Sequence, residues 1–188
     1  MAGATEHGFA EEPLPRAVAL DADFVISVLN EAEDYHRHCL RFATRLSASG
    51  TAIVCSPVLR LEVLHGWQKA INAGGITVEL LQQRPLVPDP VHIRGLLLQF
   101  GEDALSSFLA SFKQYEVRLS APLFAETREI MARYGLKPMD ACFLAAAVRI
   151  GVTDIVSLDS DFRKVDGIHL WNDHVPARRQ AARRRQRS

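Results

Sequence analysis

Short apolar runs alternate with longer amphipathic stretches along most of this chain, and the two patterns predict different elements. The short runs have the length of buried strands and end at polar or turn-forming residues. The longer stretches repeat apolar residues every three to four positions, as helices that bury one face do. The predicted strands span residues 17–20, 51–55, 155–158 and 168–170, and the predicted helices span residues 24–29, 34–46, 56–74, 122–134 and 138–150. This alternation indicates an α/β fold of three layers, with a mostly parallel central sheet and helices on both faces.

Residues 70–117 form an enlarged helical region within this pattern. Residues 76–91 contain three prolines and show no periodicity, so they predict irregular structure. Two apolar stripes follow at helical spacing, and Gly101 lies between them, so we expect two helices whose apolar faces pack in the core or on each other. A short strand is predicted near Val117. The stripes are Ile93, Leu96, Leu97 and Phe100, followed by Leu105, Phe108, Leu109 and Phe112.

The two ends of the chain differ from its middle. Residues 1–16 are aperiodic and contain Gly, Glu and Pro, so we interpret them as a flexible leader to a domain at residues 17–175. Residues 176–188 form a basic tail that we predict to be disordered. The segment 177–188 holds six Arg and no acid, whereas the rest of the chain holds 16 basic and 22 acidic residues. Such a tail can contact nucleic acid or remain solvated without a specific role.

Composition narrows the class of protein further. Apolar residues make up 48% of the 188 residues, which predicts a folded chain, and no apolar run approaches the ~20 residues that span a bilayer. The cysteines Cys39, Cys55 and Cys142 are odd in number and far apart, which indicates reduced thiols and a cytoplasmic location. His36 and His38 lie near Cys39 but lack further ligands, so this segment predicts a solvated helix rather than a zinc site.

Four acidic residues occupy positions where the apolar pattern makes a charge costly. Asp21 and Asp159 directly follow apolar strands, whereas Glu62 and Asp140 lie in helices among apolar residues. Each could by itself cap a helix or turn, or pair with a base. Because strand C-termini converge on one edge of an α/β sheet, a shared site explains all four together. Close carboxylates call for a multivalent cation, and an all-oxygen site suits Mg²⁺ or Mn²⁺, which assist the cleavage of phosphodiesters.

The order of these acids resembles that of the PIN-domain ribonucleases, and especially the VapC-type toxins of bacterial toxin–antitoxin pairs. The resemblance covers about residues 17–171, and the motif near its end is the most specific part. The matching motifs are VALDADFVISVLN with Asp21, SPVLRLEVLHG with Glu62, GLKPMDACFLAAAVRIG with Asp140, and TDIVSLDSDF with Asp159 and Asp161.

This resemblance implies a Mg²⁺- or Mn²⁺-dependent endoribonuclease with an RNA substrate, a cognate antitoxin and a homodimeric state. Ser157 matches the hydroxyl position that is usual in the family. The residue two positions after the first Asp is usually Asn, Ser or Thr, whereas here it is Asp23, which could be an additional ligand or alter the metal preference. The implied catalytic residues are Asp21, Glu62, Asp140 and Asp159, and the implied metal ligands are these four and Asp161.

Two other interpretations remain open from the sequence. The segment from Asp21 to Val25 also fits the DxDx[TV] signature of haloacid-dehalogenase-type phosphatases, in which the first Asp is a nucleophile and the second a general acid. In that interpretation Glu62 and Asp140 have no role. The third possibility is a non-catalytic binding module that keeps the PIN fold. Metal-dependent RNA cleavage separates the nuclease from both.

Overall fold

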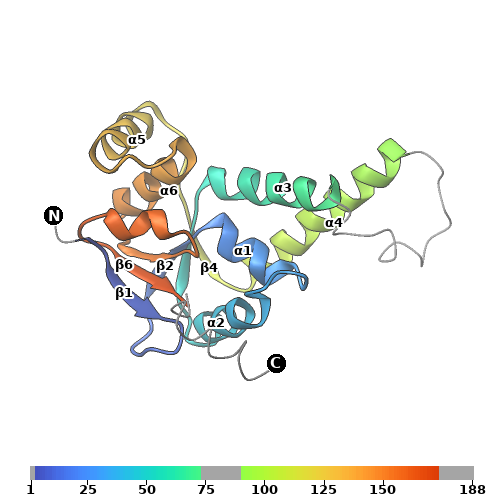
Figure 1. Cartoon of the computed structure of the whole chain (residues 1–188), viewed down its shortest axis with the longest axis horizontal. Helices are drawn as coiled ribbons and strands as arrows, with labels where there is room; N and C mark the ends of the chain where they lie inside the picture. Colours follow the sequence, from blue (N-terminus) through green and yellow to red (C-terminus); the bar gives the residue numbers. More distant parts are fainter. Residues whose placement is uncertain (1–2, 73–89, 174–188) are drawn as a thin grey trace, which may run out of the picture.

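The protein was analysed as a computed structural model, which describes residues 3–72 and 90–173. Its centre is a six-stranded sheet of strand order β1-β6-β5-β2-β3-β4, in which every pairing is parallel (Figure 1). The predicted fold class is therefore confirmed. The strands are β1 (Thr5–Gly8), β2 (Ala17–Leu20), β3 (Ala52–Cys55), β4 (Lys113–Glu116), β5 (Asp154–Val156) and β6 (His169–Asn172).

Within residues 3–72 and 90–173, six α-helices and one 3-10 helix surround the sheet, and several begin or end where the sequence supplies a cap. The Ser120 side chain accepts a hydrogen bond from Leu123 N at the start of α5, and Gly135 ends that helix at φ 63°. This left-handed conformation carries no steric cost for glycine. The helices are α1 (Ala22–Leu29), α2 (His36–Ala48), α3 (Pro57–Asn72), α4 (Pro90–Ala110), α5 (Ala121–Tyr134), α6 (Pro138–Arg149) and the 3-10 helix η2 (Ser160–Lys164).

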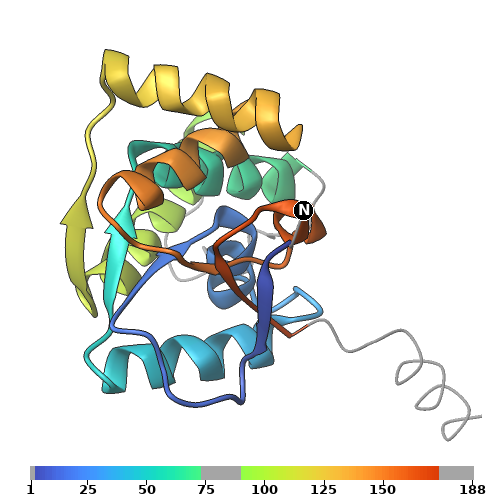
Figure 2. The same ribbon diagram turned by 90° about the vertical axis from the view of Figure 1, so that its left-hand side faces the viewer.

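The residues of the central strand β2 alternate between two hydrophobic cores, one on each face of the sheet. Val18 and Leu20 belong to the core that α1 and α2 cover, whereas Ala19 belongs to the core that α5 and α6 cover. Figure 2 shows α5 and α6 on one side of the sheet and α2 on the other. Burial on both faces explains why this strand is apolar throughout, as strands of parallel sheets usually are. The ends of the strands remain as the place for polar residues.

The N-terminal segment contains a strand that we did not predict. Thr5–Gly8 pairs with β6 as the edge strand β1, although residues 1–16 were expected to be a loose leader. The His7 ring stacks on Trp171 at a centroid distance of 4.7 Å, and its Nε2 lies 3.0 Å from His169 Nδ1. These contacts join residues far apart in the sequence. A half-exposed edge strand of four residues has too little apolar pattern to be recognised.

The two apolar stripes on either side of Gly101 form one helix, α4, where we expected two. Gly101 lies inside α4, which crosses α3 at Trp67, and a Cβ atom at position 101 would lie 2.6 Å from the indole ring. The Trp67 indole Nε1 also donates a hydrogen bond to the Leu97 carbonyl oxygen at 3.0 Å. The glycine therefore allows two helices to approach and does not break one. In Figure 1, α3 and α4 extend together away from the sheet.

Two predictions concern segments outside the described residues. The tail at 176–188 lies there entirely, and the irregular stretch at 76–91 lies there except for its last two residues. Within the described residues, no helix has both the length and the apolar character needed to cross a membrane.

Candidate metal-binding site

The site lies at the edge of the sheet where β2 and β5 end. These strands pair with Leu20 opposite Val156, so the residues that follow, Asp21 and Ser157, are brought side by side. The Ser157 hydroxyl donates to Asp21 Oδ2 at 2.6 Å, and Asp21 Oδ1 accepts from Ala22 N at 2.8 Å as the N-cap of α1. Asp21 is only 6% exposed. Burial, and next the charge of Asp23, raises the pKa of Asp21 well above its usual range.

Asp23 binds the two strand ends to each other. Its carboxylate accepts from the backbone N of Leu158 at 3.1 and 3.3 Å and from Phe24 N at 2.6 Å. Burial is the largest cause of a raised pKa for Asp23, and the charge of Asp159 adds to it. Asp23, at the position where the family usually has Asn, Ser or Thr, is therefore a sixth acid in the same cluster, with its oxygen atoms already engaged by backbone N–H groups.

Three further carboxylates converge beside this pair. One oxygen atom from each of Asp140, Asp159 and Asp161 lies within 4.8 Å of the others. Asp140 is in the first turn of α6, and Asp159 is the N-cap of η2, where its Oδ1 accepts from Asp161 N at 2.8 Å. Asp140 Oδ2 is buried and accepts no hydrogen bond from the described residues. We call these three residues the acidic triad.

Glu62, on α3, is close enough to both Asp21 and Asp140 for their charges to act on it. Its pKa is raised to about 7, first by burial and then by the charges of Asp21 and Asp140. Burial also raises the pKa of Asp140, while the lysines Lys137 and Lys164 act against it. The structure thus brings together every acid that the sequence analysis singled out. Its site contains repelling carboxylates whose charge the chain itself does not balance.

The donor set fits a hard divalent cation. All candidate ligands are carboxylate oxygens, the buried Asp140 Oδ2 lacks a partner, and Mg²⁺ or Mn²⁺ prefers such oxygens. By contrast, the earlier comparison of His36, His38 and Cys39 with a zinc site finds no support. His36 Nδ1 donates to the Ser27 carbonyl oxygen, His38 Nδ1 lies 2.5 Å from Asp173 Oδ2, and Cys39 is buried.

Two lysines beside the acidic triad were missed as part of the site from sequence. Lys137 Nζ lies 4.0 Å from Asp159 Oδ2, and Lys164 Nζ lies 3.6 Å from Asp161 Oδ1. Single lysines carry no periodic signal. Their positions, three residues before Asp140 and three after Asp161, were the available clue, because residues three apart on a helix face are neighbours.

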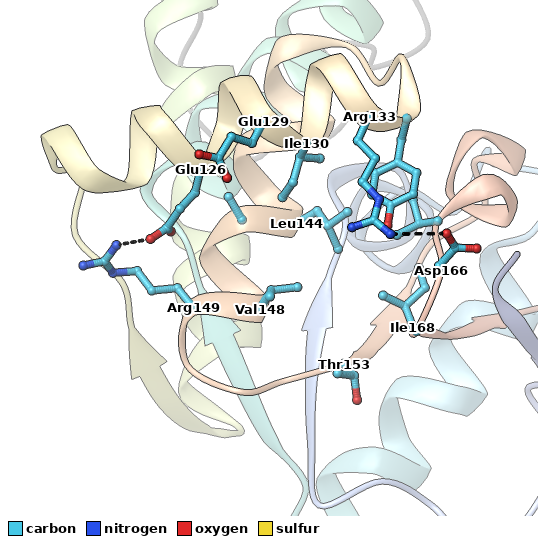
Figure 3. A pocket seen from close by; sticks show the side chains of 14 residues that line it. Glu126, Glu129, Ile130, Arg133, Leu144, Val148, Arg149, Thr153, Asp166 and Ile168 are labelled. Atoms are coloured by element: carbon cyan, nitrogen blue, oxygen red, sulfur yellow. Dashed lines mark hydrogen bonds and ion pairs between the residues drawn. The ribbon is translucent and has the colours of Figure 1, made fainter. Parts of the chain in front are cut away.

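A cavity of about 480 Å³ lies at the other end of β5 and β6 and is a separate feature (Figure 3). Its floor is apolar, with Leu144, Val148 and Ile168 among its residues, and charged side chains line its rim. Figure 3 shows two ion pairs among these charges, Arg149 with Glu126 and Arg133 with Asp166, and it also shows Glu129 beside the cavity. The cavity therefore lies apart from the site above, and two of its three acids are paired with an arginine.

Comparison with known proteins supports the family that the motifs suggested. The profile of the PIN domain family matches residues 18–168. Comparison with curated proteins finds no match. Among solved structures, PAE2754 from Pyrobaculum aerophilum is 16% identical with a TM-score of 0.53, covering 88% of this chain and 90% of that one. FitAcB from Neisseria gonorrhoeae is 14% identical with a TM-score of 0.53, covering 84% and 99%.

A third solved structure, Mycobacterium tuberculosis VapC20, is described as a toxin that cleaves the sarcin-ricin loop. It is 16% identical, with a TM-score of 0.48, and the match covers 77% of this chain and 92% of that one. At these identities the structural matches concern the fold alone, whereas the profile match spans most of the sequence and includes every acid of the site. This chain belongs to the PIN domain family.

Proposed function

We propose that this protein is a divalent-metal-dependent endoribonuclease that hydrolyses RNA phosphodiester bonds with Mg²⁺ or Mn²⁺. One observation carries the proposal: at the strand-end edge of a PIN domain, Asp140 holds a buried oxygen atom without a partner, within 4.8 Å of carboxylate oxygens of Asp159 and Asp161. An isolated charge there is costly unless a cation is bound.

The residues divide into distinct roles in this proposal. Asp140, Asp159 and Asp161 would hold the cation, with Asp21 and Glu62 completing its surroundings. When bound, such an ion supplies a Lewis acid and an activated water. Ser157 fixes the orientation of the Asp21 carboxylate through its 2.6 Å hydrogen bond. The pKa of Glu62 is about 7 in the metal-free protein, and a cation bound beside it would lower this value, so Glu62 would then be a carboxylate that can accept a proton.

The direct test is RNA cleavage by the purified chain with and without Mn²⁺. Asp140→Asn should lower the cleavage rate at least about a hundredfold, because the ligand charge is lost without a change in side-chain size. Asp166→Asn is the matched control, because Asp166 also has a buried oxygen without a partner but lies at the cavity. Wild-type protein that leaves RNA intact in Mn²⁺, or an Asp140→Asn variant as active as Asp166→Asn, would contradict the proposal.

We further propose that the protein acts as a VapC-type toxin, bound by a cognate antitoxin and forming a homodimer in the cytoplasm. The motif order and family membership support the toxin assignment. Large apolar side chains are exposed at Leu61 (60%) on α3 and at Phe124 (54%) on α5, and a protein partner could bury each of them. Sedimentation of the purified chain should give the mass of a dimer. Expression should arrest growth in the wild type and not in Asp140→Asn.

The tail at 177–188 is proposed to add non-specific RNA affinity without taking part in cleavage. Its support is its composition of six Arg without an acid. Each phosphate neutralised on a single strand contributes roughly −0.7 to the slope of log affinity against log salt. Deleting the tail should flatten that slope equally for unrelated RNA sequences while bound RNA is still cut. An unchanged slope would mean that the tail does not contact RNA.

The phosphatase interpretation is less well supported. It gives Glu62 and Asp140 no role, and Asp23 is held by two backbone N–H groups rather than free to protonate a leaving group. A small phosphomonoester incubated with the protein and Mg²⁺ separates the two activities. We expect no turnover of that substrate under conditions in which RNA is cleaved.

A further inference from the structure

Lys137 and Lys164 stand on the two segments that carry the acidic triad. Lys137 is the N-cap residue of α6, three positions before Asp140, and Lys164 is the last residue of η2, three positions after Asp161. The two ammonium groups therefore approach the triad from different elements, and both charges act on Asp140. Neither lysine has a role in the function proposed above.

The contacts of these lysines are those of loose counter-ions. The distance of 4.0 Å between Lys137 Nζ and Asp159 Oδ2 is too long for a hydrogen bond, and the Lys137 side chain is 71% exposed. Lys164 Nζ is 3.6 Å from Asp161 Oδ1, donates to the Gly135 carbonyl oxygen at 3.4 Å, and is 41% exposed. Exposed pairs of this kind contribute little to stability. Their ammonium groups can therefore leave the carboxylates at little cost.

The balance of charge indicates when the ammonium groups of Lys137 and Lys164 would leave the acidic triad. Two single positive charges face three carboxylates, so the lysines only partly neutralise the acidic triad. A divalent cation seated among the triad neutralises it more effectively and weakens the attraction that holds the lysines. A phosphodiester that reaches the same edge presents new negative charge beside them. The N-terminus of α6 also favours a phosphate at this edge, because no side chain caps its first N–H groups.

We infer that Lys137 and Lys164 are substrate-binding residues that pair with the acidic triad in the metal-free protein and with RNA phosphates once the cation is bound. This inference rests on the proposed nuclease function and adds to it. The inference predicts that each lysine has opposite effects on cation binding and on RNA binding. Each lysine competes with the cation for the same carboxylates, and each attracts the substrate of the loaded site.

The test uses the full chain with Lys137→Met, Lys164→Met and the double variant. Lys113→Met is the control, because Lys113 is the exposed first residue of β4, at the start of a strand and not at the strand-end edge. Titration with Mn²⁺ alone should show about two- to fivefold tighter binding for each site variant, the range expected from removing an exposed ion pair. Lys113→Met should leave Mn²⁺ affinity unchanged.

The second measurement is single-turnover cleavage of an unstructured RNA in saturating Mn²⁺, at increasing enzyme concentration. Each site variant should raise the half-saturating concentration roughly fivefold at 0.1 M salt and make the salt slope less negative by about 0.7, with a maximal rate close to wild type. Lys137→Arg and Lys164→Arg should behave as wild type, because they keep the charge. Unfolding curves in Mn²⁺ check that every variant is folded.

The outcomes are separable. Tighter Mn²⁺ binding together with weaker RNA binding supports the inference. Site variants that match Lys113→Met in half-saturation and salt slope overturn it while RNA cleavage by the wild type leaves the proposed function intact. Weaker Mn²⁺ binding in the site variants also overturns it, because the lysines would then support the metal site. A wild type that cleaves no RNA overturns the function and this inference together.

Discussion

The two ends of strand β5 treat acidic residues in opposite ways. At its start, beside the cavity, two of the three acids have an arginine partner: Glu126 pairs with Arg149 at 2.7 Å, and Asp166 pairs with Arg133 at 3.6 Å. At its end, buried carboxylates instead receive hydrogen bonds from a hydroxyl and from backbone N–H groups. Asp21 accepts from Ser157, and Asp23 accepts from Leu158 N.

This difference separates charges that the chain neutralises by itself from charges that need something else. A hydroxyl or an N–H group orients a carboxylate but does not cancel its charge, so several carboxylates held this way continue to repel one another. The raised pKa values of Asp21, Asp23, Glu62 and Asp140 record that repulsion together with burial. Repulsion among the carboxylates at the strand-end edge therefore lowers the stability of the metal-free protein, and a bound cation should raise it again.

The change in Tm on addition of Mn²⁺ should differ most between variants at the two ends of β5. At a concentration of about 100 times its Kd, it should stabilise the folded state by about 2.7 kcal/mol, which corresponds to a rise in Tm of roughly 5–10 °C. Asp21→Asn and Asp140→Asn should each abolish the rise in a thermal unfolding scan, whereas Asp166→Asn at the cavity should keep it. An unchanged wild-type Tm in excess Mn²⁺ would refute the metal site.

Substitution of Asp23 should give the next largest change in stability, and the direction of this change should depend on which residue replaces it. Asp23→Ala removes the acceptor for the N–H groups of Phe24 and Leu158 and should lower the free energy of unfolding by about 1–3 kcal/mol. Asp23→Asn keeps an oxygen acceptor and removes a charge that raises the pKa of Asp21, so it should raise the apo Tm and retain RNA cleavage. Denaturant unfolding of both variants measures the contrast. Equal losses in the two would show that the charge of Asp23, rather than its hydrogen bonds, stabilises the strand ends.

The raised pKa of Glu62 predicts the direction in which pH changes the stability of the apo protein. Because its folded pKa is about 7 and its usual value is 4.5, the folded state binds the proton more tightly than the unfolded state. Its contribution is therefore present below pH 4.5 and is lost as pH rises toward 7. Glu62→Gln should reduce this loss by about 1 kcal/mol, because the half-buried carboxylate is partly screened by solvent.

Unfolding in EDTA across this pH range, with Glu126→Gln as the control at the cavity, tests the prediction for Glu62. Asp21, Asp23 and Asp140 have raised pKa values too, so Glu62→Gln should flatten the pH dependence without removing it. A variant with the same pH dependence as the wild type would show that the Glu62 carboxyl does not feel the neighbouring charges.

The cavity end should give the smallest effect. Arg149→Met breaks an exposed ion pair with Glu126, in which the side chains are 37% and 41% exposed. Such pairs contribute about 0–1 kcal/mol, so we expect a shift in Tm of at most a few degrees and no change in Mn²⁺-dependent cleavage. A loss of cleavage in this variant would mean that the two ends of β5 are coupled.

The same contrast explains what the sequence could predict. Asp21 and Asp159 were predictable because each follows an apolar strand, and parallel topology places the ends of such strands together. Glu62 and Asp140 were predictable because a carboxylate among apolar helical residues is rare. The edge strand β1 was missed, because its pairing with β6 depends on the tertiary fold and not on local pattern. Lys137 and Lys164 were missed as members of the site for a similar reason, since only the fold reveals what an exposed lysine faces.

Gly101 shows a third reason why part of the fold could not be predicted from the sequence. Glycine has a low helix propensity, so its place between two apolar stripes predicted a break. The structure uses the missing side chain to admit Trp67, and α4 continues through it. Local propensity was overridden by a contact that only the packing of α3 on α4 discloses.

The pairing of β1 with β6 and the hydrogen bond from Ser157 to Asp21 have a consequence for the timing of synthesis. The two residues of that bond are 136 positions apart, and the first strand pairs with the last. A nascent chain is extended at roughly 5–20 residues per second and cannot form such pairings until β5, η2 and β6 have left the ribosome. For a nuclease of the proposed kind, catalytic competence would then arise only after β6, which ends at Asn172, has been translated. A nascent copy that still lacks these elements could not cut the messenger RNA from which it is being read.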